Sequence, residues 1–167
     1  MTKAAADVEV NFNRLGPATG TRMVVAGGCG GMGRVLVQAA MKSGVDVTVL
    51  DLLVSAERHP VPEGVSFRAV DAVDERSVKQ AFGDIASSGL IDALVNLVGF
   101  RNDLIPIEEL TSKSWDEVLE GNLRSAFLIC RAALPVMADA GTIVNVASGL
   151  GARVLPGYAP YSAAKAG

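Results

Sequence analysis

Cysteine, histidine and aromatic residues are scarce in this chain of 167 residues, which has two cysteines, one histidine and 5% aromatic residues. The two cysteines, Cys29 and Cys130, are too few for a disulfide framework and too isolated for a metal site. We therefore expect no metal centre, and a reducing cytoplasm is the default location. The one histidine, His59, precedes Pro60 in a polar stretch, which argues against a histidine-based catalytic triad.

An excess of basic residues and a long apolar run are also missing. The formal net charge of −3 argues against nucleic acid as a partner, because phosphate binding needs a basic face. No apolar run approaches the length of a membrane span, and residues 1–20 contain no apolar block of the kind that a secretory signal requires. With 50% hydrophobic and 20% charged residues, residues 21–167 are expected to form one soluble globular domain, preceded by a tail at 1–20.

Short apolar runs, rich in β-branched residues and bounded by Gly, Asp or Pro, predict the strands. The clearest of them lack period-two alternation, which is typical of strands covered on both faces in a parallel sheet. These four runs are Arg22–Ala26, Val45–Leu50, Ile91–Val98 and Thr142–Ala147, and a fifth run, Val65–Val70, alternates more.

Helical spacing fills the gaps between these runs, over Arg34–Ser43, Asp74–Ala86 and Ser112–Met137. The alternation of strands and helices predicts an α/β fold, a Rossmann-like doubly wound parallel sheet. Only five strands precede Gly167, where the chain stops one or two turns into another helix. We therefore expect a fragment whose sheet is truncated after the fifth strand.

A glycine cluster, Gly27-Gly28-Cys29-Gly30-Gly31-Met32-Gly33, joins the first predicted strand to a helix. Glycine tolerates positive φ and lets a phosphate approach backbone amides, so the cluster suggests a dinucleotide-binding loop. It fits GxGxxG, starting at Gly28, or GxxxGxG, starting at Gly27. A nucleoside-triphosphate loop is excluded because Arg34-Val35 follows, where Lys-Ser/Thr is required. The alternative is a glycine-rich turn without a ligand.

Asp51 ends the second predicted strand, about 20 residues beyond the loop, where a carboxylate can accept hydrogen bonds from the adenosine ribose hydroxyls. A 2′-phosphate would meet like charge there. It would also lack a basic partner, because Leu52 and Leu53 follow and Gly30 sits inside the loop. NAD is therefore favoured over NADP. The alternative is that Asp51 only caps a strand or turn.

Tyr161 and Lys165 stand four residues apart in Tyr-Ser-Ala-Ala-Lys, so on a helix the phenol and the ammonium share a face. A free tyrosine has a pKa of about 10 and is a poor base, but a neighbouring cation favours the phenolate. Such a pair can then exchange a proton with an alcohol or carbonyl oxygen. The spacing alone is common by chance, so the other residues near it decide its meaning.

Two polar residues supply that context. Ser148 follows a predicted strand, at the end of the sheet where ligands bind, and its hydroxyl can donate to a substrate oxygen. A hydrolase elbow is excluded because Val146 stands where GxSxG has its first glycine. Asn122 falls on a mostly apolar stripe of the third predicted helix, where a buried amide needs partners. The alternatives are a turn serine and a structural amide bridge.

Together these residues resemble the short-chain dehydrogenase/reductase family, from about Arg22 to Gly167, because several motifs follow the family's order and spacing. The resemblance favours the glycine register that starts at Gly27. It matches Asn96-Leu97-Val98-Gly99 to the family's Asn-Asn-Ala-Gly motif and Asp71 to the aspartate beside the adenine ring. It implies cofactor contacts from Gly27, Gly31, Met32, Gly33, Asp51, Leu52, Asp71, Ala72, Asn96, Gly99, Tyr161 and Lys165.

The resemblance also implies a catalytic tetrad. Tyr161 would be the general acid/base, and Ser148 would orient and stabilise the substrate oxygen. Lys165 would bind the nicotinamide ribose and tune Tyr161, while Asn122 would hold a water that relays protons. Tyr158 does not match, because serine rather than lysine stands four residues later. The implied activity is NAD-dependent interconversion of a secondary alcohol and a ketone, both small molecules.

The chain departs from the family at Ala26, where threonine is usual, and at Leu97, where the second asparagine is usual. These changes exchange a polar contact for an apolar one. The resemblance further implies a homodimer or homotetramer. We expect substrate selectivity to come from residues 100–103, from residues 149–157 and mostly from a C-terminal part beyond Gly167. Two other functions stay open: a nucleotide-binding or regulatory protein without turnover, and an epimerase or dehydratase on the same scaffold.

Overall fold

The structure, a computed structural model, describes residues 16–101, 104–153 and 155–167. These residues form a five-stranded parallel sheet with the strand order β3-β2-β1-β4-β5, which confirms the predicted doubly wound α/β fold. The strands are β1 (Arg22–Ala26), β2 (Asp46–Asp51), β3 (Ser66–Ala69), β4 (Ile91–Asn96) and β5 (Met137–Asn145).

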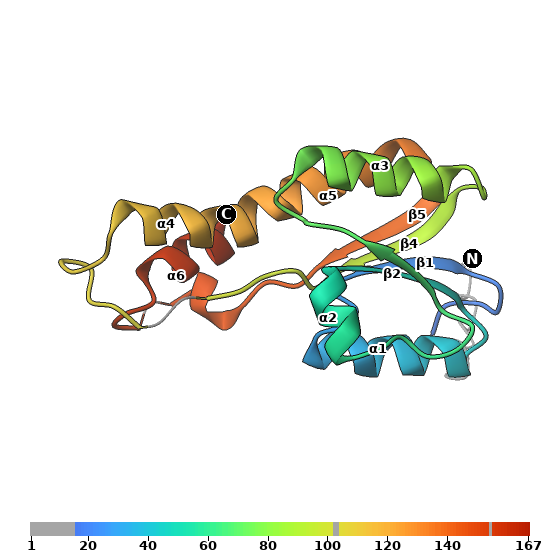
Figure 1. The fold of residues 1–167 in the computed structure, drawn as a ribbon, viewed down its shortest axis with the longest axis horizontal. Coiled ribbons are helices and arrows are strands. Elements are labelled where there is room, and N and C mark those ends of the chain that lie inside the picture. Colours follow the sequence, from blue (N-terminus) through green and yellow to red (C-terminus); the bar gives the residue numbers. More distant parts are fainter. Residues whose placement is uncertain (1–15, 102–103, 154) are drawn as a thin grey trace, which may run out of the picture.

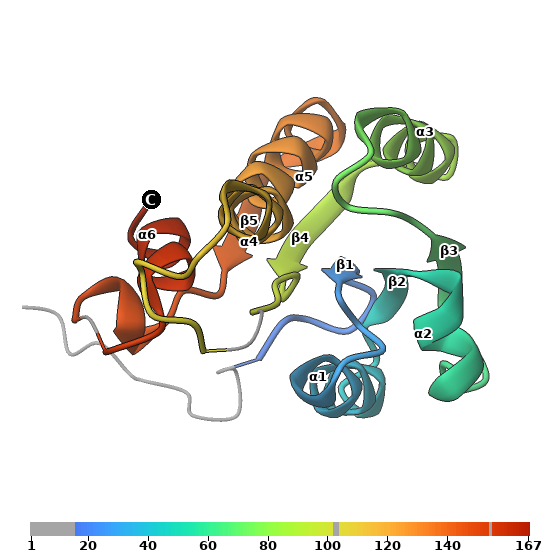
Figure 2. The same ribbon diagram turned by 60° about the vertical axis from the view of Figure 1, so that its left-hand side comes forward.

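Helices cover both faces of the sheet, with α1 and α2 below it and α3 and α5 above it in Figure 1. Two further helices, α4 and α6, contact each other beyond the carboxyl ends of β4 and β5 (Figures 1 and 2). The helices are α1 (Gly31–Lys42), α2 (Leu53–Arg58), α3 (Glu75–Ala86), α4 (Ser112–Leu119), α5 (Ser125–Ala133) and α6 (Ala159–Ala166).

Each face of the sheet has its own apolar core, because successive strand residues point to opposite faces. Val24 of β1 packs with Phe82 of α3 and Ile129 of α5 in one core. Val25, the next residue, packs with Val37 of α1 in the other. The sheet is thus buried on both sides near its centre, which explains why its strands read as continuous apolar runs.

The predicted helix at Ser112–Met137 is wrong in its continuity and in its end. Between α4 and α5 lies a π-helical turn, η2 (Glu120–Arg124), where the Ser125 Oγ donates to the Gly121 carbonyl at 2.9 Å. The helix then stops in a 3-10 turn, η3 (Leu134–Val136), which contains a proline with no N–H to donate. Met137 already belongs to β5, which pairs with β4 across a register shift.

The other strand boundaries differ from prediction by a few residues at their ends. β2 begins at Asp46 rather than Val45, β4 ends at Asn96 rather than Val98, and β5 spans Met137–Asn145 rather than Thr142–Ala147. The short helix α2 was not predicted at all, because its six residues bury no side chain and so carry no apolar stripe.

The predicted tail at 1–20 lies mostly outside the described residues, which begin at Gly16. Its last residues are joined to the body of the fold, since Gly20 N donates to the Gly44 carbonyl at 2.8 Å. Within the described ranges, every helix is too short or too polar to span a membrane.

Candidate active site

The glycine loop makes a turn that side chains would block. Gly27 has a φ of 79°, and a Cβ added there would lie 3.1 Å from the Leu97 backbone. A Cβ on Gly33 would collide with the Gly27 carbonyl oxygen. Gly31, the first residue of α1, has nothing within 4 Å of such a Cβ. The register that starts at Gly27 therefore has two glycines that close the turn and one that leaves backbone open at a helix N-terminus, where anions bind.

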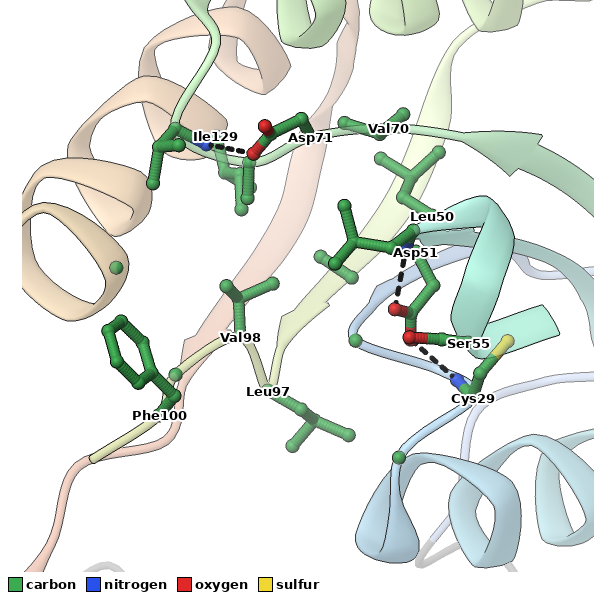
Figure 3. A pocket seen from close by; sticks show the side chains of 18 of the residues that line it. Cys29, Leu50, Asp51, Ser55, Val70, Asp71, Leu97, Val98, Phe100 and Ile129 are labelled. Atoms are coloured by element: carbon green, nitrogen blue, oxygen red, sulfur yellow. Dashed lines mark hydrogen bonds between the residues drawn. The ribbon is translucent and has the colours of Figure 1, made fainter. Parts of the chain in front are cut away.

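Asp51 is fixed at the end of β2 by two backbone donors. Its Oδ2 accepts from Cys29 N at 2.9 Å, and its Oδ1 accepts from Leu52 N at 2.8 Å (Figure 3). The pKa of the Cys29 thiol is raised, mainly because the thiol is buried and also because the negative charge of Asp51 lies nearby. Asp51 is thus tied to the glycine loop and has oxygen lone pairs left for hydroxyl donors.

A cavity of about 550 Å³ opens in front of Asp51. Figure 3 shows that Asp51 and Asp71 enter it from neighbouring strand ends, while Val98 and Phe100 line the opposite wall. Asp71 Oδ1 accepts from Val73 N at 3.1 Å, which shapes the turn after β3. Of the predicted cofactor residues, the cavity brings together Gly27, Asp51, Leu52, Asp71, Ala72 and Gly99.

Four predicted cofactor residues from the loops do not line this cavity. Gly31 and Met32 are exposed at the start of α1, whereas Gly33 is buried below them. The fourth, Asn96, is buried and already bonded within the protein: its Nδ2 donates to Asn145 Oδ1 at 3.0 Å and its Oδ1 accepts from Val98 N at 3.1 Å. Its side chain holds the loop after β4 in place.

The expectation that no basic residue lies near Asp51 is wrong. Arg58 and His59, at the end of α2, line the same cavity. The neighbours of Asp51 in sequence, Leu52 and Leu53, do not show this, because α2 folds its last turn back toward the loop. Helix α2 was not predicted, and sequence reasoning therefore missed these two residues.

The two departures from the family motif meet in the structure. Leu97 N donates to the Ala26 carbonyl at 2.9 Å, and both residues line the cavity. A main-chain hydrogen bond therefore joins the glycine loop to the loop after β4 without help from a threonine or asparagine side chain. The apolar pair Ala26 and Leu97 supplies contact surface instead.

The π-helical turn η2 presents Asn122 to the other end of the site. Its Nδ2 donates to the Phe100 carbonyl at 2.6 Å and to the Val118 carbonyl at 2.8 Å. Its Oδ1 is buried and has no hydrogen-bond partner among the described residues. A buried acceptor without a partner is costly, and in a functional site it marks a place for a water or ligand.

Lys165 and Asn122 converge on Gly99. A Cβ on Gly99 would lie 2.6 Å from Asn122 Oδ1 and 3.1 Å from Lys165 Nζ, so only glycine leaves room for both. Lys165 Nζ donates to the Val146 carbonyl at 3.2 Å. Burial lowers the pKa of Lys165. Gly99 also lines the cavity of Asp51, so the two polar groups lie beside one of its lining residues.

Tyr161 belongs to α6, with Lys165 Nζ 5.7 Å from its ring centroid. Tyr158 precedes the helix and meets the Tyr161 ring edge-on, with the centroids 6.4 Å apart. The predicted pair of Tyr161 and Lys165 is therefore together on one helical turn, whereas Tyr158 lies outside that turn.

Ser148 begins the loop that packs against α6. Its Oγ accepts from Leu150 N at 3.2 Å. Gly151, three residues after Ser148, lies so close to α6 that a Cβ there would meet the Lys165 carbonyl. Across the described ranges no hydrogen bond joins Ser148 to Tyr161, and the Ser148 hydroxyl donates to none of the residues in these ranges. Asn102, Asp103 and Val154, in the segments expected to set selectivity, lie outside the described residues.

These features fit a nicotinamide dinucleotide. The open backbone at Gly31 suits the pyrophosphate, Asp51 suits the adenosine ribose, and the orphaned Asn122 Oδ1 with Lys165 suits the nicotinamide end. In the part of the chain that the structure describes, no group of three His, Cys, Asp or Glu residues could hold a metal ion.

Known proteins are similar to this chain in sequence and fold. The family model for short chain dehydrogenases matches residues 21–167. The chain is 32% identical over 152 residues to a 3beta-hydroxysteroid dehydrogenase of Mediterraneibacter gnavus, covering 86% of this chain and 55% of that protein. It is 32% identical over 142 residues to a short chain dehydrogenase/reductase of Macrophomina phaseolina, covering 78% of this chain and 81% of that protein.

A solved structure gives the same result. A mutant of a Serratia marcescens short-chain dehydrogenase/reductase superposes with a TM-score of 0.80 at 29% identity, covering 90% of this chain and 65% of that one. The chain spans little more than half the length of the steroid dehydrogenase. The family model over residues 21–167 and the similarity to these relatives lead to one conclusion: this chain belongs to the short-chain dehydrogenase/reductase family of oxidoreductases.

Proposed function

We propose that the protein carrying this chain is an NAD-dependent oxidoreductase that interconverts a secondary alcohol and a ketone. The observation that carries the proposal is the position of Gly99. This one residue lines the cavity of Asp51, and a side chain on it would meet Asn122 Oδ1 and Lys165 Nζ. A cofactor that reaches from Asp51 past Gly99 would meet the amide, the ammonium and the neighbouring phenol of Tyr161.

NAD, when bound, would supply the hydride acceptor for alcohol oxidation or, in its reduced form, the hydride donor for ketone reduction. Tyr161 would take the hydroxyl proton in the first direction and give a proton to the carbonyl oxygen in the second. The ammonium of Lys165, 5.7 Å from the ring centroid, stabilises negative charge that develops on the phenol.

Ser148 and Asn122 complete the proposed chemistry. The Ser148 Oγ already accepts from Leu150 N, so its hydrogen is available to donate to the substrate oxygen. The free acceptor of Asn122 faces the same glycine as Lys165, which is where a water could pass a proton from the ammonium toward solvent. Both assignments agree with the family resemblance in the sequence.

The choice of NAD over NADP rests on Asp51. Its carboxylate is held by two backbone donors and cannot turn away from a 2′-phosphate. Arg58 lies in the same cavity and would favour the opposite choice. We give Asp51 more weight because a fixed charge at the strand end acts at shorter range than an exposed, flexible guanidinium.

Turnover by the Tyr161→Phe variant tests the proposal. A panel of secondary alcohols with NAD, followed by NADH absorbance, should show net reduction by the native protein. The variant should lose at least about a hundredfold in kcat, because its general acid/base is gone. Its NAD dissociation constant should stay within about threefold, since a loss of 1.4 kcal/mol would change it tenfold.

The same assay separates the other functions. An epimerase or dehydratase that recycles its cofactor would release no NADH, and a binding protein would retain affinity without turnover. Full turnover by Tyr161→Phe would contradict the proposed role of the phenol.

A further inference from the structure

We propose that Arg101 and Tyr158 form a subsite for an anionic group of the substrate, so that the protein acts on hydroxy acids and oxo acids. The acid group would be a carboxylate that lies away from the reacting carbon. This inference rests on the proposed function, because it names the substrate class of the same site.

The backbone before Arg101 is anchored in the active site. The Phe100 carbonyl accepts from the Asn122 amide at 2.6 Å, and the Phe100 ring covers Gly121, where a Cβ would collide with it. The next described residue after Arg101 is Leu104, which packs against Gly157 just before α6. The Arg101 guanidinium lies over the ring of Tyr158, the residue before α6, and therefore stands next to the Tyr161 helix.

Four side chains lie in a row, in the order Arg101, Tyr158, Tyr161 and Lys165. The Arg101 Cζ lies 5.6 Å from the centroid of the Tyr158 ring, and the Tyr158 ring meets the Tyr161 ring edge-on. Lys165 Nζ lies over the Tyr161 ring in turn. The two tyrosines are thus flanked by two cations, and the proposed chemistry uses only the cation at Lys165.

The donors of Arg101 bind none of the residues that the structure describes. Arg101 is exposed, and no hydrogen bond or ion pair joins it to any residue of the described ranges. Contact with the face of Tyr158 orients a guanidinium without using its N–H groups. A guanidinium so placed can bind a carboxylate through two parallel hydrogen bonds, which a lysine could not match.

Binding of the proposed nucleotide does not explain the position of Arg101. Arg101 is absent from the residues that line the cavity of Asp51, although its neighbours Gly99 and Phe100 are among them. A second hollow lies beside Tyr158, since Gly157 and Ala159 line it together with Leu104, Ile107, Leu155 and other mainly apolar residues. An acid with an apolar body fits this combination better than a neutral sugar does, because the walls offer few hydrogen-bond partners.

The test compares matched acids and amides on the intact protein. One pair is 4-acetylbenzoate and 4-acetylbenzamide, and a second is levulinate and levulinamide; each pair differs only in charge at one end. The kcat/KM for each is measured with NADH in the native protein and in Arg101→Gln, Arg101→Lys and Tyr158→Phe. Arg76→Gln removes the same charge from α3, far from the site, as the matched control. Calorimetry of the same compounds with NADH and the Tyr161→Phe variant measures binding without turnover.

The native protein should prefer at least one acid over its amide by about tenfold or more in kcat/KM, as expected for a charge-assisted bidentate contact. Arg101→Gln should reduce this ratio to about one, Arg101→Lys should keep part of it, and Arg76→Gln should keep all of it. Loss of the ratio with unchanged amide turnover places the effect at the anion subsite. A protein that turns over the amides equally well, or a ratio that survives Arg101→Gln, would overturn the inference and leave the proposed function standing.

If no compound is turned over, the binding measured by calorimetry decides whether the subsite exists. Binding of an acid but not its amide, lost when Arg101→Gln is added to Tyr161→Phe, supports the subsite and counts against the proposed chemistry. Equal or absent binding of acids and amides overturns the subsite.

Discussion

The two ends of the site differ in how completely the protein satisfies its own polar groups. At the nucleotide end, Asp51 accepts from two backbone amides and Asp71 accepts from a third. At the catalytic end lie both of the buried side-chain atoms that have no hydrogen-bond partner among the described residues, Asn122 Oδ1 and Ser162 Oγ. The half-buried ammonium of Lys165 lies there too, with a lowered pKa.

This difference matches the work that each end would do. A binding surface gains from groups that are already held in place, because little order is lost when the ligand arrives. A reacting surface needs groups whose partners arrive with the substrate or cofactor, and the protein holds these at some cost to its stability. Substitutions at the two ends should therefore change different quantities, which the following experiments can measure.

The largest effect is expected from Asn122→Ala at the catalytic end. The substitution removes the free acceptor and leaves the Phe100 and Val118 carbonyls without their donor. We expect kcat to fall by about a hundredfold, with less than about a threefold change in the dissociation constant of NAD. Steady-state kinetics and calorimetry measure the two quantities. If NAD affinity fell as much as kcat, the two ends of the site would not act independently.

Next in size is the effect of Gly33→Ala at the nucleotide end. Its Cβ would meet the Gly27 carbonyl, so the loop must move, at a cost of about 1–3 kcal/mol in stability. We expect a lower free energy of unfolding and weaker NAD binding, measured by urea denaturation and calorimetry. Gly83→Ala is the control, because Gly83 lies in α3 with nothing within 4 Å of a Cβ. It should stabilise the protein, as alanine is the better helix former.

A smaller effect, on cofactor choice, is expected from Asp51→Asn. An amide keeps the shape of the carboxylate but can accept fewer hydrogen bonds and carries no charge. We expect NAD affinity to fall by about tenfold and NADP affinity to rise, since one lost charge-assisted hydrogen bond is worth about 1.5–3 kcal/mol. In Asp51→Asn/Arg58→Gln the rise in NADP affinity should vanish. A rise that persists without Arg58 would show that this guanidinium is irrelevant to cofactor choice.

The smallest effect is a change of stability with pH in Lys165→Met. Burial lowers the pKa of Lys165 in the folded protein, so the protonated amine opposes folding. This cost is fully present below the folded-state pKa and fades as pH rises through it toward 10.5. The stability of Lys165→Met relative to native protein should therefore be greater at pH 7 than at pH 10, by urea unfolding at both. Lys79→Met removes the same charge from the surface, and an equal pH effect there would refute the explanation.

Much of the fold could be predicted because burial of a parallel sheet imposes a local pattern. Apolar runs such as Val47–Leu50 and the glycine cluster show their structure through steric and solvation rules that act within a few residues. The predicted helix at Ser112–Met137 was wrong where the local sequence keeps a helical pattern but the backbone leaves the α-helix. The π-helical turn at Asn122 and the strand that begins at Met137 depend on contacts with Phe100 and β4, far away in the chain.

The pairing of Tyr161 with Lys165 was determined by the sequence itself, because residues four apart on a helix share a face whatever surrounds them. Only the tertiary structure brought Gly99, Asn122 and Lys165 to one point, carried Arg58 into the cavity of Asp51, and set Arg101 over Tyr158. These contacts are made between residues of separate strands, helices and loops. Their distances follow from how the helices pack on the sheet, and packing is a property of the whole fold rather than of any one segment.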